Sequence, residues 1–219
     1  AIDEAVVKYG DGSLKGAQKF LAAINQAKAV NEDLNSTIAQ MEEEEENLSR
    51  AAFTYQLDNG SGAAPKVTTD PRFVRGSSSA YGRLTYSGVS ESNLQEVGFC
   101  WSTQPNPTIH DNRSTAYYDW NGKIYRMEGL QPATVYYVRA YALTKTFAVG
   151  YGEVLKIITI PRGQCSYSYN WGGDADANQR IDAAGADATN YYNNFTSIKG
   201  YHSTINYGSG TPTADCSYG

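Results

Sequence analysis

The chain has 219 residues, which is enough for one large domain or two to three small ones. Its net charge of −5 comes from 18 basic and 23 acidic residues that form no basic stripe, which argues against nucleic-acid binding. No apolar run approaches the roughly 20 residues that a bilayer-spanning helix needs, so no transmembrane segment is predicted.

Residues 1–58 have the apolar periodicity of an α-helical hairpin. The first stripe, with Ser13 as a candidate N-cap, consists of Leu14, Ala17, Leu21, Ile24 and Ala27. The second stripe consists of Ile38, Met41, Leu48, Ala52 and Tyr55. Thr37 and Gln40 have the spacing of a capping box at the start of the second helix.

The stretch from 21–28 through 51–53 resembles the small helical modules of the FIVAR kind, which recur in bacterial surface proteins. The resemblance implies a spacer or a contact surface. The acidic run Glu42–Glu46 lies in the second helix, and carboxylates one residue apart splay around a helix instead of converging on one ion. We therefore interpret the run as a solvated helix face.

Residues 59–66 are rich in Gly, Ser and Pro and predict a linker. In residues 67–161, short runs of alternating apolar and polar residues predict a β-domain. Turn signals at 86–88, 105–107, 121–122 and 150–152 separate the strands. The expected strands are Phe73–Arg75, Ser79–Tyr86, Glu96–Ser102, Thr115–Asp119, Lys123–Glu128, Thr134–Ala142 and Glu153–Ile160. About seven short strands are typical of a β-sandwich.

The segment 129–142 resembles the corner of fibronectin type III domains, with Leu130, Pro132, Thr134, Tyr136 and Arg139 at the matching positions. The resemblance implies a tyrosine corner, in which the Tyr136 hydroxyl bonds to the backbone near the turn at 130–132. The segments 97–103 and 150–153 resemble a variant that is common in secreted proteins of gut bacteria. They imply an extracellular or outer-surface location. Because residues 1–4 are no signal peptide, a secretion signal would already have been removed.

Two kinds of side chain in the β-domain are candidates for function. Cys100 falls within an apolar strand pattern and is expected to be a buried thiol. Tyr118, Trp120 and Tyr125 surround the Asn121-Gly122 turn and form a candidate sugar-binding platform, although strand alternation places about half of such aromatic residues in the core. His110 is interpreted as a solvated loop residue.

Residues 162–219 predict a small α/β strand–helix–strand segment, which is too small to bury a core alone. We expect it either to pack on the sandwich or to begin something larger. Cys165 and Cys216 flank it and form a disulfide in an oxidising compartment or remain two reduced thiols. The acidic stretch 174–182 is similar to the start of a calcium-binding loop, but Gln179 and Gly185 replace the glycine and the closing carboxylate of such a loop.

The stretches 166–169, 174–196 and 207–219 resemble the opening of a zincin-type metallopeptidase-like domain. The resemblance implies an H-E-x-x-H zinc helix further along the chain. This sequence has no such motif and only two histidines, His110 and His202. We therefore assign no catalytic residue, no metal ligand and no cofactor to this chain, and zinc only to a downstream segment.

These observations predict non-catalytic N-terminal modules, acting as spacer or interaction surface, of a secreted or cell-surface metallopeptidase-like protein. The alternative is an adhesion module that binds a host or dietary glycan or protein at a bacterial surface. A freestanding enzyme is disfavoured, because the sequence has no Ser/His/Asp set, phosphate-binding glycine loop or metal cluster.

Overall fold

The structure is a computed structural model that describes residues 1–116 and 124–159. These residues form two compact units. One comprises Ala1–Ala63 with Thr146–Val149, and the other comprises the remaining described residues. Each unit is described by itself below.

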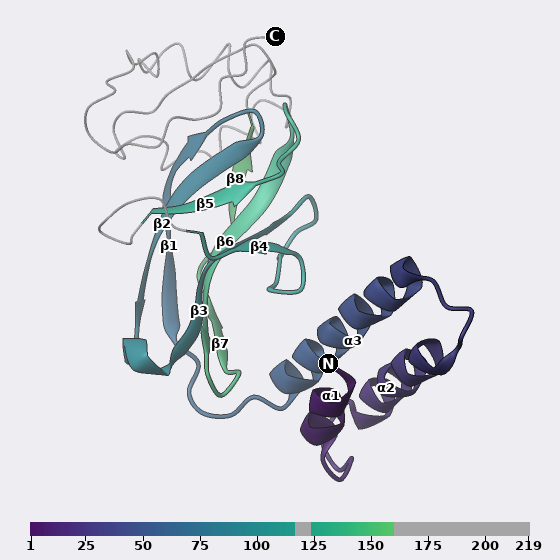
Figure 1. Ribbon diagram of the computed structural model, residues 1–219. Helices are drawn as coiled ribbons and strands as arrows, with labels where there is room; N and C mark the ends of the chain where they lie inside the picture. The colour runs from purple at the N-terminus through teal and green to yellow at the C-terminus, as the bar shows by residue number, and fades with distance from the viewer. Residues whose placement is uncertain (117–123, 160–219) are drawn as a thin grey trace, which may run out of the picture. The chain divides into compact units, whose positions relative to one another are not determined.

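The first unit contains three helices, α1 (Ile2–Tyr9), α2 (Ala17–Glu32) and α3 (Ile38–Asp58), so the expected two-helix hairpin is corrected to three helices (Figure 1). The core lies where they meet and consists of Ala5, Ala17, Phe20, Ile24, Ala27, Leu48, Ala52 and Tyr55. Phe20 and Tyr55 stack with ring centroids 4.8 Å apart. The Tyr55 hydroxyl donates a hydrogen bond to the Tyr9 carbonyl, which ties α3 to α1.

Helix α3 begins at the capping box that the sequence predicts. The Thr37 hydroxyl accepts a hydrogen bond from the Gln40 amide at 3.3 Å, and Gln40 Oε1 accepts one from the Thr37 amide at 2.8 Å. The expected cap of the preceding helix is wrong. The N-cap of α2 is Gly16, at a φ of 80°, and not Ser13.

Four of the ten residues of the predicted apolar stripes lie outside the core. Leu14, Leu21, Ile38 and Met41 are exposed. Phe20 fills the place expected for its neighbour Leu21, because the larger ring reaches Tyr55. Ile38 and Met41 belong to the first turns of α3. The apolar periodicity of α3 continues through these turns although Ile38 is 76% exposed. Periodicity in the sequence identifies the apolar face of a helix, but it does not show how far along that face another helix packs.

The second unit is an antiparallel sandwich. Its strands are β1 (Lys66–Arg75), β2 (Ser79–Ser87), β3 (Leu94–Ser102), β4 (Asn112–Ser114), β5 (Ile124–Glu128), β6 (Val135–Thr144), β7 (Val149–Tyr151) and β8 (Leu155–Ile158). One sheet has the order β1-β2-β5, and the other has the order β4-β3-β6-β7 with β8 also on β6 (Figure 1). A short 3-10 helix, Glu91–Asn93, leads into β3.

Three expected strand boundaries are corrected. The first strand begins at Lys66, well before Phe73. The strand expected at Thr115–Asp119 is replaced by β4 at 112–114, residues 115–116 are not in a strand, and 117–119 lie outside the described residues. The turn expected at 150–152 lies partly within an additional strand, β7, and the strand expected from Glu153 begins later, as β8 at Leu155.

Strand β1 pairs with β2 on both sides of an irregularity. Its register on β2 shifts between Thr69 and Phe73, and Pro71 lies within that shift. The buried Thr69 hydroxyl accepts a hydrogen bond from the Ala140 amide of β6 at 3.0 Å. Residues 152–154 between β7 and β8 are not in a strand. The Thr69 hydroxyl therefore provides the Ala140 amide with the acceptor that a backbone carbonyl of a continuous neighbouring strand would have provided.

The sandwich core fills the space between the two sheets. It includes Phe73, Phe99, Trp101, Tyr125, Met127 and Ile157. Phe99 makes edge contacts with Phe73 and Tyr125, at centroid distances of 5.7 and 6.2 Å. A Cβ atom on Gly82 would lie 2.5 Å from the Phe73 ring and 2.8 Å from the Phe99 ring, so this glycine makes room for both.

The predicted tyrosine corner is confirmed. Tyr136 is buried, and its hydroxyl accepts a hydrogen bond from the Gln131 amide at 2.8 Å. The Thr159 hydroxyl accepts from the Thr134 amide at 2.9 Å and donates to the Gln131 carbonyl at 2.6 Å, which closes the same corner. Together with the two antiparallel sheets, this corner makes the sandwich fibronectin type III-like.

Candidate functional site

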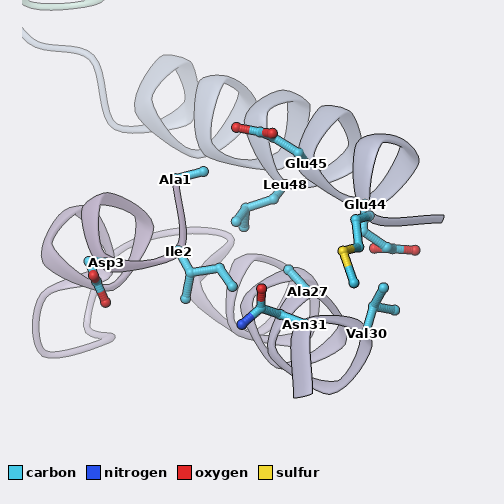
Figure 2. Close-up of a pocket in the computed structure, with 10 residues that line it drawn as sticks. Ala1, Ile2, Asp3, Ala27, Val30, Asn31, Glu44, Glu45 and Leu48 are labelled. Carbon is cyan, nitrogen blue, oxygen red and sulfur yellow. The ribbon is translucent and has the colours of Figure 1, made fainter. Parts of the chain in front are cut away.

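The helical unit contains an open pocket between its three helices, here called the three-helix pocket (Figure 2). Its volume is about 360 Å³, within the roughly 300–1,000 Å³ range of small-ligand pockets. Its lining residues are Ala1, Ile2, Asp3, Ala27, Val30, Asn31, Met41, Glu44, Glu45 and Leu48. The described helices therefore provide a concave surface.

Part of the inner surface of the three-helix pocket is apolar. Ile2 of α1, Val30 of α2 and Leu48 of α3 all line the pocket, and in Figure 2 Ile2 and Leu48 lie near each other while Val30 lies closer to Glu44. Leu48 and Ala27 are buried and form its floor, whereas Ile2 and Val30 are half-buried. Met41 is 40% exposed, so an occupant of the pocket would cover apolar surface that is now in contact with water.

Carboxylates surround this apolar surface. Asp3, Glu44 and Glu45 line the pocket and lie on different sides of it in Figure 2. Asn47 donates a weak hydrogen bond to Glu44 at 3.5 Å. Within residues 1–116 and 124–159, no ion pair neutralises Asp3, Glu44 or Glu45, whereas Glu46 lies 3.9 Å from Arg50.

The acidic rim belongs to an acidic unit. Residues 1–63 contain eleven Asp and Glu side chains against five Lys and Arg, so this stretch accounts for all of the chain's net negative charge. The run Glu42–Glu46 is mostly exposed, as predicted for a solvated face. Two of its members nevertheless border the three-helix pocket, and the sequence pattern did not reveal this.

The sandwich has a second polar cluster, on the outer side of the β3–β6 pair. Glu96 Oε2 accepts a hydrogen bond from the Tyr141 hydroxyl at 3.0 Å and lies 3.3 Å from Arg113 Nε. Arg113 also donates to the Ile109 carbonyl, and the Tyr151 hydroxyl accepts from the Ile109 amide. These contacts fix the loop before β4 onto the sheet, which is a structural role.

The Cys100 thiol is buried and is not exposed to solvent. Cys100 is a fully buried free cysteine, as predicted, and it donates to the Arg139 carbonyl at 3.7 Å. Burial raises its pKa to about 11, so it is protonated at neutral pH. Burial, and then the nearby Glu96 charge, also raises the pKa of Tyr141.

The predicted sugar-binding platform is not assembled by the described residues. Tyr125 is 8% exposed and packs in the sandwich core, because β5 points it inward beside Met127. Tyr118 and Trp120 lie outside the described residues, as do Cys165, Cys216 and the whole segment 162–219. His110 is exposed in its loop, as expected.

Among residues 1–116 and 124–159, no group of three or more His, Cys, Asp or Glu side chains is arranged to hold a metal ion. None of the helices found there is long and apolar enough to cross a membrane.

Comparison with known proteins finds similar solved structures only. No protein-family model and no curated protein matches the chain. The sixth fibronectin type III domain of human fibronectin type III domain containing protein 3 is 23% identical with a TM-score of 0.32, covering 49% of this chain and 97% of its own.

A second fibronectin type III domain described for that human protein is 14% identical with a TM-score of 0.35, covering 49% of this chain and 97% of its own. The fn3 domain of human contactin 1 is 16% identical with a TM-score of 0.32, covering 50% of this chain and 87% of its own. The fold assignment rests on the strand order and the Tyr136 corner, and these likenesses add no argument to it.

Proposed function

We propose that this chain is a non-catalytic interaction and spacer module, in which the helical unit binds another polypeptide at the three-helix pocket. The observation that carries the proposal is the concave apolar surface formed by Ile2, Val30, Met41 and Leu48. Spacer and adhesion roles are common for fibronectin type III-like domains, and in this proposal the sandwich serves as the spacer.

An uncharged fluorescent dye that brightens in apolar surroundings tests whether the pocket accepts an apolar group. We expect saturable binding to the full chain, and weaker binding to Met41→Ser, which removes part of the wall. Ile38→Ser is the matched control, because Ile38 is also exposed on α3 but does not line the pocket. Equal losses in both variants, or no saturable binding, would contradict the proposal.

We further propose that these modules belong to a secreted or cell-surface protein of a gut bacterium and precede a zincin-type metallopeptidase-like domain. The support is the sequence resemblance of residues 162–219 and of the segments 97–103 and 150–153. Sequencing the native gene past codon 219 tests this. We expect an H-E-x-x-H helix, and a stop codon directly after Gly219 would contradict it.

The alternative of a glycan-binding adhesion module stays a prediction that now depends on Tyr118 and Trp120 alone, since Tyr125 is in the core. Titration with mucin-type sugars tests it. Binding that Trp120→Ala leaves unchanged would rule this platform out.

A further inference from the structure

We propose that the occupant of the three-helix pocket is a cationic amphipathic α-helix of another protein. The inference rests on the proposed function above and deepens it by naming the chemistry of the partner. Two properties of the pocket lead to it: its apolar interior and its unneutralised acidic rim.

An amphipathic helix can present apolar side chains to the interior of the pocket. The pocket runs between three helices and draws its wall from each of them, through Ile2, Val30 and Leu48. A helix that lies in such a groove inserts side chains three and four residues apart. Met41 at the wall is unbranched and flexible, which suits a surface that adapts to an inserted side chain.

The rim selects the charge of that helix. Asp3, Glu44 and Glu45 line the pocket, and none of the three forms an ion pair with a described residue. The Ala1 N-terminus also lines the pocket, so the carboxylates outnumber the one positive group there by three to one. Lys or Arg residues beside the inserted apolar stripe would lie opposite these carboxylates. Each exposed ion pair of this kind strengthens binding by roughly 1.5- to 5-fold.

The same charges disfavour other occupants. An acidic peptide or an anionic membrane surface would be repelled by a unit with eleven carboxylates and five basic side chains. A second copy of the helical unit carries the same excess of negative charge, so self-association through this face is disfavoured as well.

Fluorescence anisotropy with three synthetic peptides and the full chain tests the inference. Each peptide has about 18 residues, long enough to form a helix. One carries Leu at helical spacing with Lys elsewhere, one replaces the Lys by Glu, and one keeps the Leu and Lys composition but breaks the stripe. We expect saturable binding of the first alone, weakening as salt is added.

Paired variants place the contact at the pocket. Glu44→Gln with Glu45→Gln should weaken binding of the Leu/Lys peptide by roughly 2- to 25-fold. The control is Glu42→Gln with Glu43→Gln, which removes the same charge from the same helix outside the pocket lining. Met41→Ser should weaken the binding of both the Leu/Lys peptide and the dye.

The outcomes separate this inference from the function beneath it. Dye binding without binding of the Leu/Lys peptide would overturn the inference and leave the proposed function standing. Equal binding of the scrambled peptide, or equal losses in the two glutamate pairs, would also overturn it, because either result indicates diffuse charge attraction. Self-association of the chain that Met41→Ser abolishes would make a second copy the occupant. If neither the dye nor the Leu/Lys peptide bound, the proposed function would be contradicted as well.

Discussion

At the scale of single residues, Thr69 has the most consequential hydrogen bond of the sandwich. Its hydroxyl is the acceptor for the Ala140 amide, at a buried point where the last strand is interrupted. Thr69→Val keeps the shape and removes the acceptor, which leaves a buried N–H unsatisfied. We expect a loss of about 1–3 kcal/mol in the free energy of unfolding, measured by urea denaturation.

Thr69→Ser is the control for that variant, because serine keeps the hydroxyl and loses only a methyl group. It should retain most of the stability. A valine variant as stable as the serine variant would show that water or a shifted strand replaces the hydroxyl.

Cys100 predicts a pH dependence. Its folded pKa of about 11 lies above the ordinary value of 9.0, so folding favours the protonated thiol. The stabilisation is complete below pH 9 and is lost as the pH rises from 9 to 11. The pKa of Tyr141 is raised as well, so its burial also stabilises the folded state less as the pH increases, over a higher pH range.

Comparison of the wild type with Cys100→Ala measures this effect. Between pH 8 and pH 10 the stability advantage of the wild type over the variant should shrink by about 1 kcal/mol, since one proton is released on unfolding. An advantage that is constant with pH would mean that the folded thiol titrates normally.

At the scale of elements, the close contacts of Gly82 in β2 explain how three aromatic rings fit between two sheets. The Phe73 and Phe99 rings occupy the space that a side chain at position 82 would need. Gly82→Ala should therefore destabilise the sandwich by about 1–3 kcal/mol through overpacking. Thr85→Ala, at an exposed position of the same strand, should cost a few tenths of a kcal/mol.

The same scale shows what the sequence predicts well. The Tyr136 corner and the Thr37–Gln40 capping box were predictable, because each depends on residues within a few positions of one another. Helix α1 was missed although Ile2, Ala5, Val6 and Tyr9 recur at helical spacing, because a stretch of eight residues is too short for the pattern to stand out.

The three-helix pocket was beyond prediction for a related reason. Its wall combines one or a few residues from each of three helices, and no local pattern relates Ile2 to Val30 or Leu48. The burial of Tyr125 was not predictable either. It depends on the register of β5, and strand alternation alone does not decide which of two neighbouring residues faces the core.

At the scale of the whole molecule, the two units have separate hydrophobic cores. We therefore expect two unfolding transitions, one followed by the helical circular dichroism signal and one by tryptophan fluorescence, because all three tryptophans lie outside residues 1–63. Thr37→Ala removes the α3 cap and should lower only the helical transition, by about 1 kcal/mol.

Gly82→Ala should lower only the transition that is followed by fluorescence. Ser49→Ala, at an exposed position of α3, is a neutral control for the cap variant. If the cap variant and the glycine variant each shifted both signals equally, the chain would unfold as one cooperative body.

The irregularity in β1 also affects how copies of the chain meet. Among the described strands, β1 ends its sheet, and a straight, regular edge is a template onto which another chain can add a strand. Pro71 has no amide hydrogen to offer, and the register shift around it breaks the row of donors and acceptors. We therefore expect this edge to be a poorer template for fibrillar aggregation than a regular strand would be.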